Sequence, residues 1–176
     1  FLVFLASILL SWLLTSQVRR YAMAQDLLDI PNDRSSHTVP TPRGGGLAII
    51  IVLLLAGLVS LFLPQAPIDV LVCLLLATLA FSLLGWQDDK HDLPASVRFL
   101  IQLLIAVFAS GWLLWATVPG YSTSFASVAL LLLSTLWIAW MANLYNFMDG
   151  IDGISAVESL ILGATTSYWF AISGVA

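Results

Sequence analysis

The chain has 176 residues and a formal net charge of -4; 60% of its residues are hydrophobic and only 9% are charged. A soluble globular domain carries about 25% charged residues, so this chain has too few polar side chains to cover a water-soluble body. The composition therefore predicts a membrane protein. No basic stripe is present, which excludes nucleic acid as an expected partner. The single cysteine, Cys73, cannot form an internal disulfide and is expected to be a small buried hydrophobe.

Six uncharged runs follow one another along the chain, and each is expected to form a membrane-spanning helix. A helix needs about 20 apolar residues to cross about 30 Å of hydrocarbon. The runs cover residues 1–17, 46–67, 70–87, 99–119, 122–141 and 154–176, and turn residues at 118–124 separate the fourth from the fifth. None of them alternates with the period of a strand. The expected fold is therefore an all-α, polytopic transmembrane bundle that forms one membrane-embedded domain over residues 1–176.

Both ends of the sequence lie inside apolar runs, which predicts a fragment of a longer protein. The polar loops at about residues 18–45, 88–98 and 142–153 are expected on one side of the membrane. In or beside these loops lie all six basic residues: Arg19, Arg20, Arg34, Arg43, Lys90 and Arg98. The positive-inside rule places this side in the cytoplasm and the N-terminus outside. Most of the acidic residues lie in the same loops, so any chemistry is expected on the cytoplasmic face.

The first candidate cluster is Asp88, Asp89 and Asp92, directly after the third run. Adjacent carboxylates repel each other, and a bound divalent cation removes that cost. On a helix Asp88 and Asp92 would share a face. Oxygen ligands of this kind suit Mg²⁺, which typically takes one or two carboxylates together with substrate phosphates. The alternative is a solvated acidic loop that caps the next helix.

The second cluster repeats a polar side chain at every third position: Asn143, Asn146, Asp149 and Asp152. The intervening glycines are expected to let the chain leave helical geometry and bring its backbone close to a ligand. Amides and carboxylates at the end of an apolar helix are costly unless something binds them. A helix terminus with Asp152 as the N-cap of the next run would explain only one of the four residues.

The third cluster is a loop rich in proline, glycine and basic residues that leads into the second run. Its Gly44-Gly45-Gly46 triplet opens a helix, where backbone N–H groups favour anions. Thr41 and Arg43 add donors that suit phosphate. The alternative is a flexible cytoplasmic linker. Taken together, the three clusters are compatible with metal-assisted phosphoryl transfer at a membrane surface, and also with an ion or phosphate transporter.

Three stretches resemble the polyprenyl-phosphate N-acetylhexosaminyl-1-phosphate transferases, glycosyltransferase family 4. They are residues 40–46, the pattern Asp88-Asp89-x-x-Asp92, and residues 143–153. Aspartate at position 92 is more similar to the members that use N-acetylglucosamine or N-acetylfucosamine, including those that initiate O-antigen synthesis, than to the peptidoglycan enzyme. Such proteins have about ten spans, and two further cytoplasmic motifs lie beyond the region matched here. The resemblance therefore implies an N-terminal part that is inactive alone.

The resemblance implies transfer of N-acetylhexosamine-1-phosphate from a UDP-sugar to undecaprenyl phosphate in the bacterial inner membrane, with release of UMP and Mg²⁺ or Mn²⁺ as the cofactor. Asp88 and Asp89 are the implied catalytic residues. The implied substrate-binding residues are Asn143, Asn146, Asp149, Asp152, Thr41 and Arg43. Asp88, Asp89 and Asp152 are the implied metal-binding residues, with the main ligand outside this chain. The oligomeric state is left open, a homodimer included.

Two other functions fit the sequence less well. A transporter subunit would carry polar residues at mid-membrane, in broken helices, whereas the runs here are apolar inside. A CDP-alcohol phosphotransferase would carry its aspartates in a longer array, which this sequence does not contain.

Overall fold

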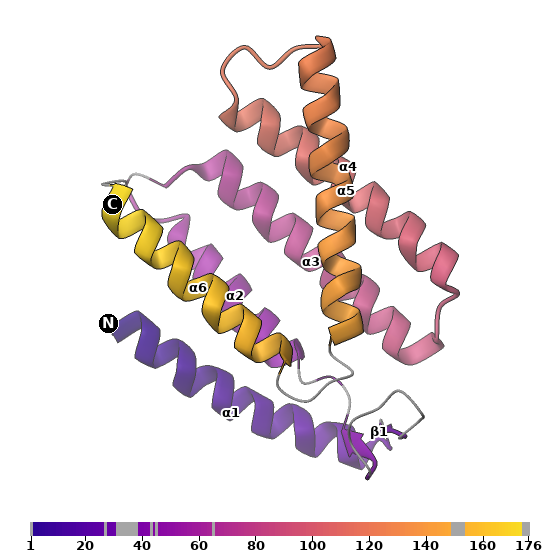
Figure 1. The fold of residues 1–176 in the computed structure, drawn as a ribbon. Helices are drawn as coiled ribbons and strands as arrows, with labels where there is room; N and C mark the ends of the chain where they lie inside the picture. Colours follow the sequence, from indigo (N-terminus) through magenta and orange to yellow (C-terminus); the bar gives the residue numbers. More distant parts are fainter. Residues whose placement is uncertain are drawn as a thin grey trace. The chain divides into compact units, whose positions relative to one another are not determined.

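The computed structural model describes residues 2–26, 28–30, 39–42, 44, 46–64, 66–148 and 154–173. These residues form six helices and two very short strands (Figure 1). The helices are α1 (Leu2–Ala24), α2 (Gly46–Ser60), α3 (Ile68–His91), α4 (Ala95–Thr117), α5 (Phe125–Met148) and α6 (Ile154–Ser173). The strands β1 (Leu28–Asp29) and β2 (Thr41–Pro42) pair as a two-stranded sheet. The expected all-α membrane bundle is confirmed.

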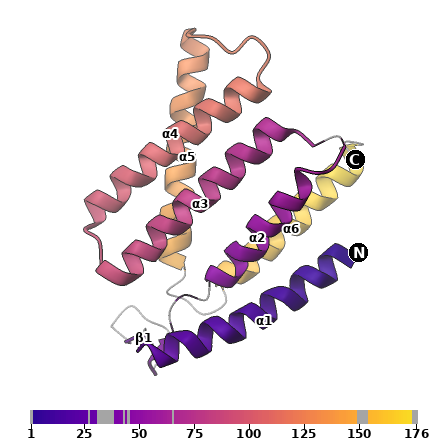
Figure 2. The ribbon, with the colours of Figure 1, turned by 180° about the vertical axis from the view of Figure 1, so that it is seen from behind.

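The chain divides into two compact units, and each is described by itself. The first contains Phe1–Asp29 and Pro42–Trp140, and the second contains Ile30–Thr41 and Met141–Ala176. Within the first unit, α1 packs on α2, α2 on α3, and α3 on α4. Figures 1 and 2 show these four helices side by side in chain order. The expectation of a single membrane-embedded domain stays a prediction.

The helices of the first unit meet through small side chains. The buried apolar residues of the described chain are Ala22, Ala48, Cys73, Leu84, Ala106, Ala109 and Ala139. The Cys73 thiol lies 3.6 Å from the carbonyl oxygen of Ala109, which confirms that this cysteine is buried at a helix contact. Many large apolar side chains point outward instead; Trp12, for example, is 65% exposed. Small residues inside and large ones outside are the pattern of helices packed in lipid.

Three helices, α3, α4 and α5, are long and apolar enough to cross a membrane. α2 is apolar but has only 15 residues, which gives it a length of about 22 Å. It ends earlier than the apolar run predicts, because the backbone N–H groups of Phe62 and Leu63 donate to carbonyls only three residues back and Pro64 follows. Proline has no N–H to donate and cannot continue a helix. The count of six spans stays a prediction.

The polar segments that follow the first, third and fifth apolar runs are more helical than expected. α1 continues to Ala24, α3 to His91 and α5 to Met148, so each extends several residues past its apolar run. Lys90 is a good helix former, and aspartate and asparagine, although weaker, do not end a helix by themselves. Only special backbone geometry does so; after α1 it is Asp26, at φ 53°. As expected, a break separates α4 from α5, and the Ser124 hydroxyl caps the start of α5 through the Ser127 N–H.

Candidate functional site

The acidic cluster lies at the tight turn that joins α3 to α4. Asp92 ends α3 in the left-handed conformation, at φ 44° and ψ 63°, and its N–H donates to the Asp88 carbonyl at 2.9 Å. Pro94 directly precedes α4, where a residue without an N–H costs nothing. The expectation that Asp88 and Asp92 share a helix face is wrong, because the chain leaves the helix at Asp92.

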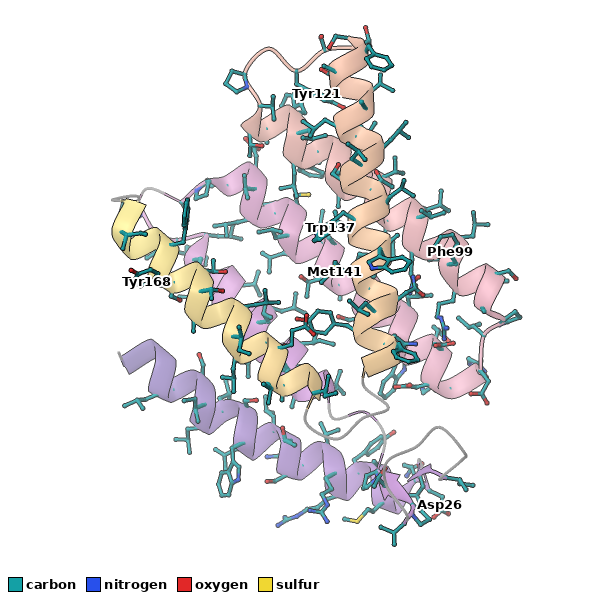
Figure 3. All side chains as sticks on the ribbon, in the orientation of Figure 1. Asp26, Phe99, Tyr121, Trp137, Met141 and Tyr168 are labelled. Atoms are coloured by element: carbon teal, nitrogen blue, oxygen red, sulfur yellow. The ribbon has the colours of Figure 1, made fainter. Side chains whose placement is uncertain are left out.

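Both carboxylate oxygens of Asp88 are engaged within this turn. Arg98, one turn into α4, donates from Nη1 to Asp88 Oδ2 at 2.7 Å. The Leu93 N–H donates to Asp88 Oδ1 at 3.1 Å. Phe99, the neighbour of Arg98, is labelled in Figure 3 and marks this part of α4. Asp88 therefore fastens the end of α3 to the start of α4.

Asp89 faces a different part of the molecule from Asp88. Successive residues of an α-helix are rotated by about 100°, so adjacent carboxylates on α3 cannot point the same way. Asp89 is exposed and lines a cavity of about 350 Å³ that is walled by α1, the start of α2 and the end of α3. Of the two predicted catalytic aspartates, Asp89 is therefore the one that a molecule in this cavity can reach.

Three residues of α3 contribute to that cavity: Trp86, Asp89 and Lys90. They share one face of the helix because they are three and four positions apart. The Lys90 ammonium lies 4.5 Å from the centroid of the Trp86 ring, a cation–π arrangement. The cavity thus carries a cation and a carboxylate at the α3 end, and Tyr21 lines it from α1.

Gly44, the first residue of the predicted glycine triplet, lines the same cavity. Its φ of +89° is a backbone conformation that residues other than glycine rarely adopt. Its carbonyl accepts the Leu47 N–H at 3.0 Å, which starts α2. A Cβ at this position would meet Val18 of α1 at 3.8 Å. The glycine therefore lets the loop turn into α2 close to α1 and beside Asp89.

The remaining predicted site residues lie in the second unit or outside the described residues. Asn143 and Asn146 lie three positions apart on α5, which is helical through them and ends at Met148. The glycines that were expected to let the chain leave helical geometry lie outside the described residues. Asn146 is exposed and Asn143 is partly buried. Both belong to the second unit, as does Thr41 of β2. Arg43, Asp149 and Asp152 lie outside the described residues.

Within the described ranges, no group of three His, Cys, Asp or Glu side chains lies close enough to hold a metal ion. Asp88 already accepts hydrogen bonds from a guanidinium and a backbone N–H, which would compete with a metal for its carboxylate oxygens. Oxygen ligands such as Asp89 suit Mg²⁺, which leaves part of its coordination to substrate phosphate. The predicted metal site made of Asp88, Asp89 and Asp152 stays a prediction.

Arg98 and Trp86 are the residues that sequence reasoning missed at this site. Arg98 counted only as one of the basic residues that set the orientation. Its role could have been predicted from its position one turn after Pro94. A helix that starts directly after this proline brings residue 98 close to the end of the preceding helix. Trp86 precedes Lys90 by four residues, the spacing at which an aromatic ring and a cation meet on a helix.

Comparison with known proteins now identifies the family. Residues 71–176, more than half of the chain, match the family model described as glycosyl transferase family 4. The chain belongs to glycosyl transferase family 4. The resemblance found in the sequence motifs is thereby confirmed, and the matched region of this family member includes most of α3 with Asp88 and Asp89, and the whole 143–153 stretch.

The curated relatives of this family member include three named transferases. A probable undecaprenyl-phosphate N-acetylglucosaminyl 1-phosphate transferase of Bacillus subtilis (strain 168) is 34% identical over 104 residues, covering 59% of this chain and 28% of the relative. A phospho-N-acetylmuramoyl-pentapeptide-transferase of Synechococcus sp. (strain JA-3-3Ab) is 31% identical over 128 residues, covering 68% and 36%. An undecaprenyl-phosphate alpha-N-acetylglucosaminyl 1-phosphate transferase of Thermotoga maritima is 30% identical over 102 residues, covering 58% and 31%. The chain thus spans roughly a third of the length of these relatives, and no solved structure matches it.

Proposed function

We propose that the whole protein transfers N-acetylhexosamine-1-phosphate from a UDP-sugar to undecaprenyl phosphate and releases UMP. The observation that carries this proposal is the family match over residues 71–176, which contains two of the three polar clusters. Two of the relatives are named as N-acetylglucosaminyl 1-phosphate transferases, which supports N-acetylglucosamine as the sugar. The product would start the synthesis of a lipid-linked cell-envelope polysaccharide of the O-antigen type.

In this reaction an oxygen of the lipid phosphate attacks the phosphorus bonded to the sugar. A new P–O bond forms, the bond from that phosphorus to the UMP oxygen breaks, and UMP leaves with the bonding electrons. The second pKa of a phosphate monoester is about 6, so the attacking group is largely ionised at neutral pH. Positioning therefore contributes more than removal of a proton. A divalent cation, when bound, neutralises charge on the pyrophosphate.

We assign the following roles in this reaction to residues of this chain. Asp89, exposed at the cavity, contacts the lipid phosphate or the metal that accompanies it. Asp88 and Arg98 hold the α3–α4 turn and thereby fix where Asp89 points. Asn143, Asn146, Asp149 and Asp152 bind the nucleotide sugar, and Thr41 and Arg43 contact phosphate. We place these groups on the cytoplasmic face of the bacterial inner membrane, because the basic residues lie beside them.

The test uses membranes that contain the whole protein. They are incubated with undecaprenyl phosphate, Mg²⁺ and one radiolabelled UDP-N-acetylhexosamine at a time, and both label in extracted lipid and UMP release are counted. We expect equal amounts of labelled lipid and UMP from one sugar, and loss of both when EDTA is added. Folded protein that produces neither from any sugar would return the transporter alternative to first place.

A further inference from the structure

Two hydroxyl groups are buried inside the membrane-spanning helices of the first unit. Ser110 on α4 is 2% exposed and Thr135 on α5 is 7% exposed. Among the residues that the structure describes, neither hydroxyl oxygen has a hydrogen-bond partner. Buried polar groups are nearly always paired, because an unpaired one loses its bonds to water and gains none in return. These two hydroxyls therefore call for a partner.

Other hydroxyls on the same helices are satisfied by their own backbone. The Ser134 hydroxyl donates to the Leu131 carbonyl at 3.1 Å, and the Thr117 hydroxyl donates to the Leu113 carbonyl at 2.7 Å. A bond to a carbonyl three or four residues back is a common solution for serine and threonine within a helix. Ser110 does not use it, although a helix offers it at every position. Its hydroxyl is thus available to a group outside its own helix, as is that of Thr135.

The two hydroxyls lean toward the same place. α4 and α5 run in roughly opposite directions from the break at residues 118–124, and α5 crosses α4 (Figure 1). A Cβ on Gly111 would lie 3.9 Å from Leu131 Cδ1, which puts the crossing beside Ser110. Side chains on a helix are tilted toward its N-terminus. Thr135, one turn after Leu131, therefore leans back toward the crossing, and Ser110 leans along α4 in the direction from which Thr135 approaches.

The surroundings restrict the chemistry of the shared partner. It must be small, because Ser110, Thr135 and Ala106, one turn before Ser110, are all more than nine-tenths buried. It must donate as well as accept, because a hydroxyl has one donor and two acceptor lone pairs. Residues 95–148 contain no aspartate or glutamate, which disfavours a cation. Water meets these conditions, and a buried water typically makes about three hydrogen bonds to groups that otherwise lack partners.

We infer that Ser110 and Thr135 bind one ordered water at the crossing of α4 and α5. The Ala106 carbonyl, which has a second lone pair, can accept its remaining hydrogen. Apolar packing gives membrane helices little preference for one another, so a polar bridge of this kind stabilises the crossing. It also holds α5, the helix that carries Asn143 and Asn146, against α4. The inference does not depend on the proposed function.

Four proteins test whether the hydroxyls share a ligand: the unchanged whole protein, Ser110→Ala, Thr135→Val and the double variant. Thr135→Val keeps the shape of the side chain and removes only the hydroxyl. Each single substitution should lower Tm by about 2 °C, because the water and the remaining hydroxyl lose a partner. The double variant should lose less than the sum, since one water serves both hydroxyls. Hydroxyls without a ligand predict an unchanged or higher Tm for each single variant, and that result would overturn the inference, as would losses that simply add.

Matched controls separate the hydroxyl from other effects of substitution. Thr135→Ser keeps the hydroxyl and removes a methyl group, so Ser110→Ala should cost as much in this background as in the unchanged protein. Ser134→Ala removes a neighbouring hydroxyl that its own helix already satisfies, and its effect should add to that of Ser110→Ala. Coupling of equal size in the Thr135→Ser, Thr135→Val and Ser134→Ala backgrounds would contradict a water bound by Ser110 and Thr135.

Radiolytic labelling detects the water itself. Hydroxyl radicals formed by a short X-ray pulse oxidise side chains beside bound water, even where bulk solvent has no access, and mass spectrometry locates them. In the purified whole protein we expect oxidation of Leu131, with slow uptake of ¹⁸O after mixing with H₂¹⁸O. Tyr121, in the loop between α4 and α5, reports bulk solvent and should exchange at once. Loss of the Leu131 label in the double variant supports the inference; a label that persists there, or no Leu131 label in a protein labelled at Tyr121, overturns it.

Discussion

The Asp88–Arg98 pair should contribute measurably to the stability of the protein. Its two side chains are 17% and 26% exposed, and the atoms lie 2.7 Å apart. Exposed pairs contribute about 0.2–1 kcal/mol, and breaking a buried pair costs about 3–5 kcal/mol. A pair of intermediate burial should fall between these limits, so Arg98→Ala should lower the free energy of unfolding by about 1–3 kcal/mol. Part of that cost comes from leaving Asp88 with only the Leu93 N–H as partner.

A double-mutant cycle isolates the pair from the rest of the turn. Arg98→Ala, Asp88→Asn and the double variant are unfolded in detergent micelles by a denaturing detergent, with helix content as the readout. We expect a coupling energy of about 1 kcal/mol or more, since contacting residues couple by about 0.5–3 kcal/mol. Arg98→Lys should restore part of the loss, because it keeps the charge but not the planar geometry. Additivity within about 0.3 kcal/mol would refute the reasoning that this pair joins α3 to α4.

Three other substitutions follow from the described contacts. A Cβ on Gly57 would meet Leu75 Cδ2 at 2.6 Å, whereas one on Gly85 meets nothing within 4 Å. The Gly57→Ala protein should therefore be about 1–3 kcal/mol less stable than the Gly85→Ala protein in the same unfolding assay. Adding Leu75→Ala should remove that difference. Gly44→Ala forces a side chain into φ +89° and should cost about 1–2 kcal/mol, seen as a lower Tm; an unchanged Tm would contradict the strained turn. Asp89→Asn should reduce kcat of the whole protein by about a hundredfold, and near-normal turnover would remove Asp89 from the proposed chemistry.

Hydrophobic patterning was sufficient to predict the helices and their breaks. The interruption at residues 118–124 carries proline, glycine and serine, which end and restart helices through local chemistry, and the structure has α4 and α5 on either side of it. Helix ends were less predictable. α3 continues through Asp88 and Lys90, since neither residue prevents the backbone hydrogen bonds of a helix. Hydrophobic patterning indicates where the apolar run ends, not where the helix ends.

The roles of adjacent aspartates could not be separated from the sequence alone. Asp88 and Asp89 have the same chemistry and the same distance from the apolar run, so the motif treats them as equivalent. Their difference comes from which neighbouring helix each one faces. Asp88 meets Arg98 across the turn, and Asp89 lines the cavity walled by α1, α2 and α3. Such a difference depends on tertiary packing, which residue spacing along one helix does not encode.

The same geometry gives a reason for two consecutive aspartates at the end of a membrane helix. A single carboxylate that held the α3–α4 turn through Arg98 would have its oxygens engaged, and it would not be available to a substrate. If the only carboxylate faced the cavity, the end of α3 would be held by backbone hydrogen bonds alone. Because successive helix residues are rotated by about 100°, Asp88 can hold the end of α3 while Asp89 faces the cavity. This division requires an exposed Asp89 and a tied Asp88, which is the arrangement the structure has. It also explains why the two should respond differently to replacement: Asp88→Asn through stability and positioning, and Asp89→Asn through turnover.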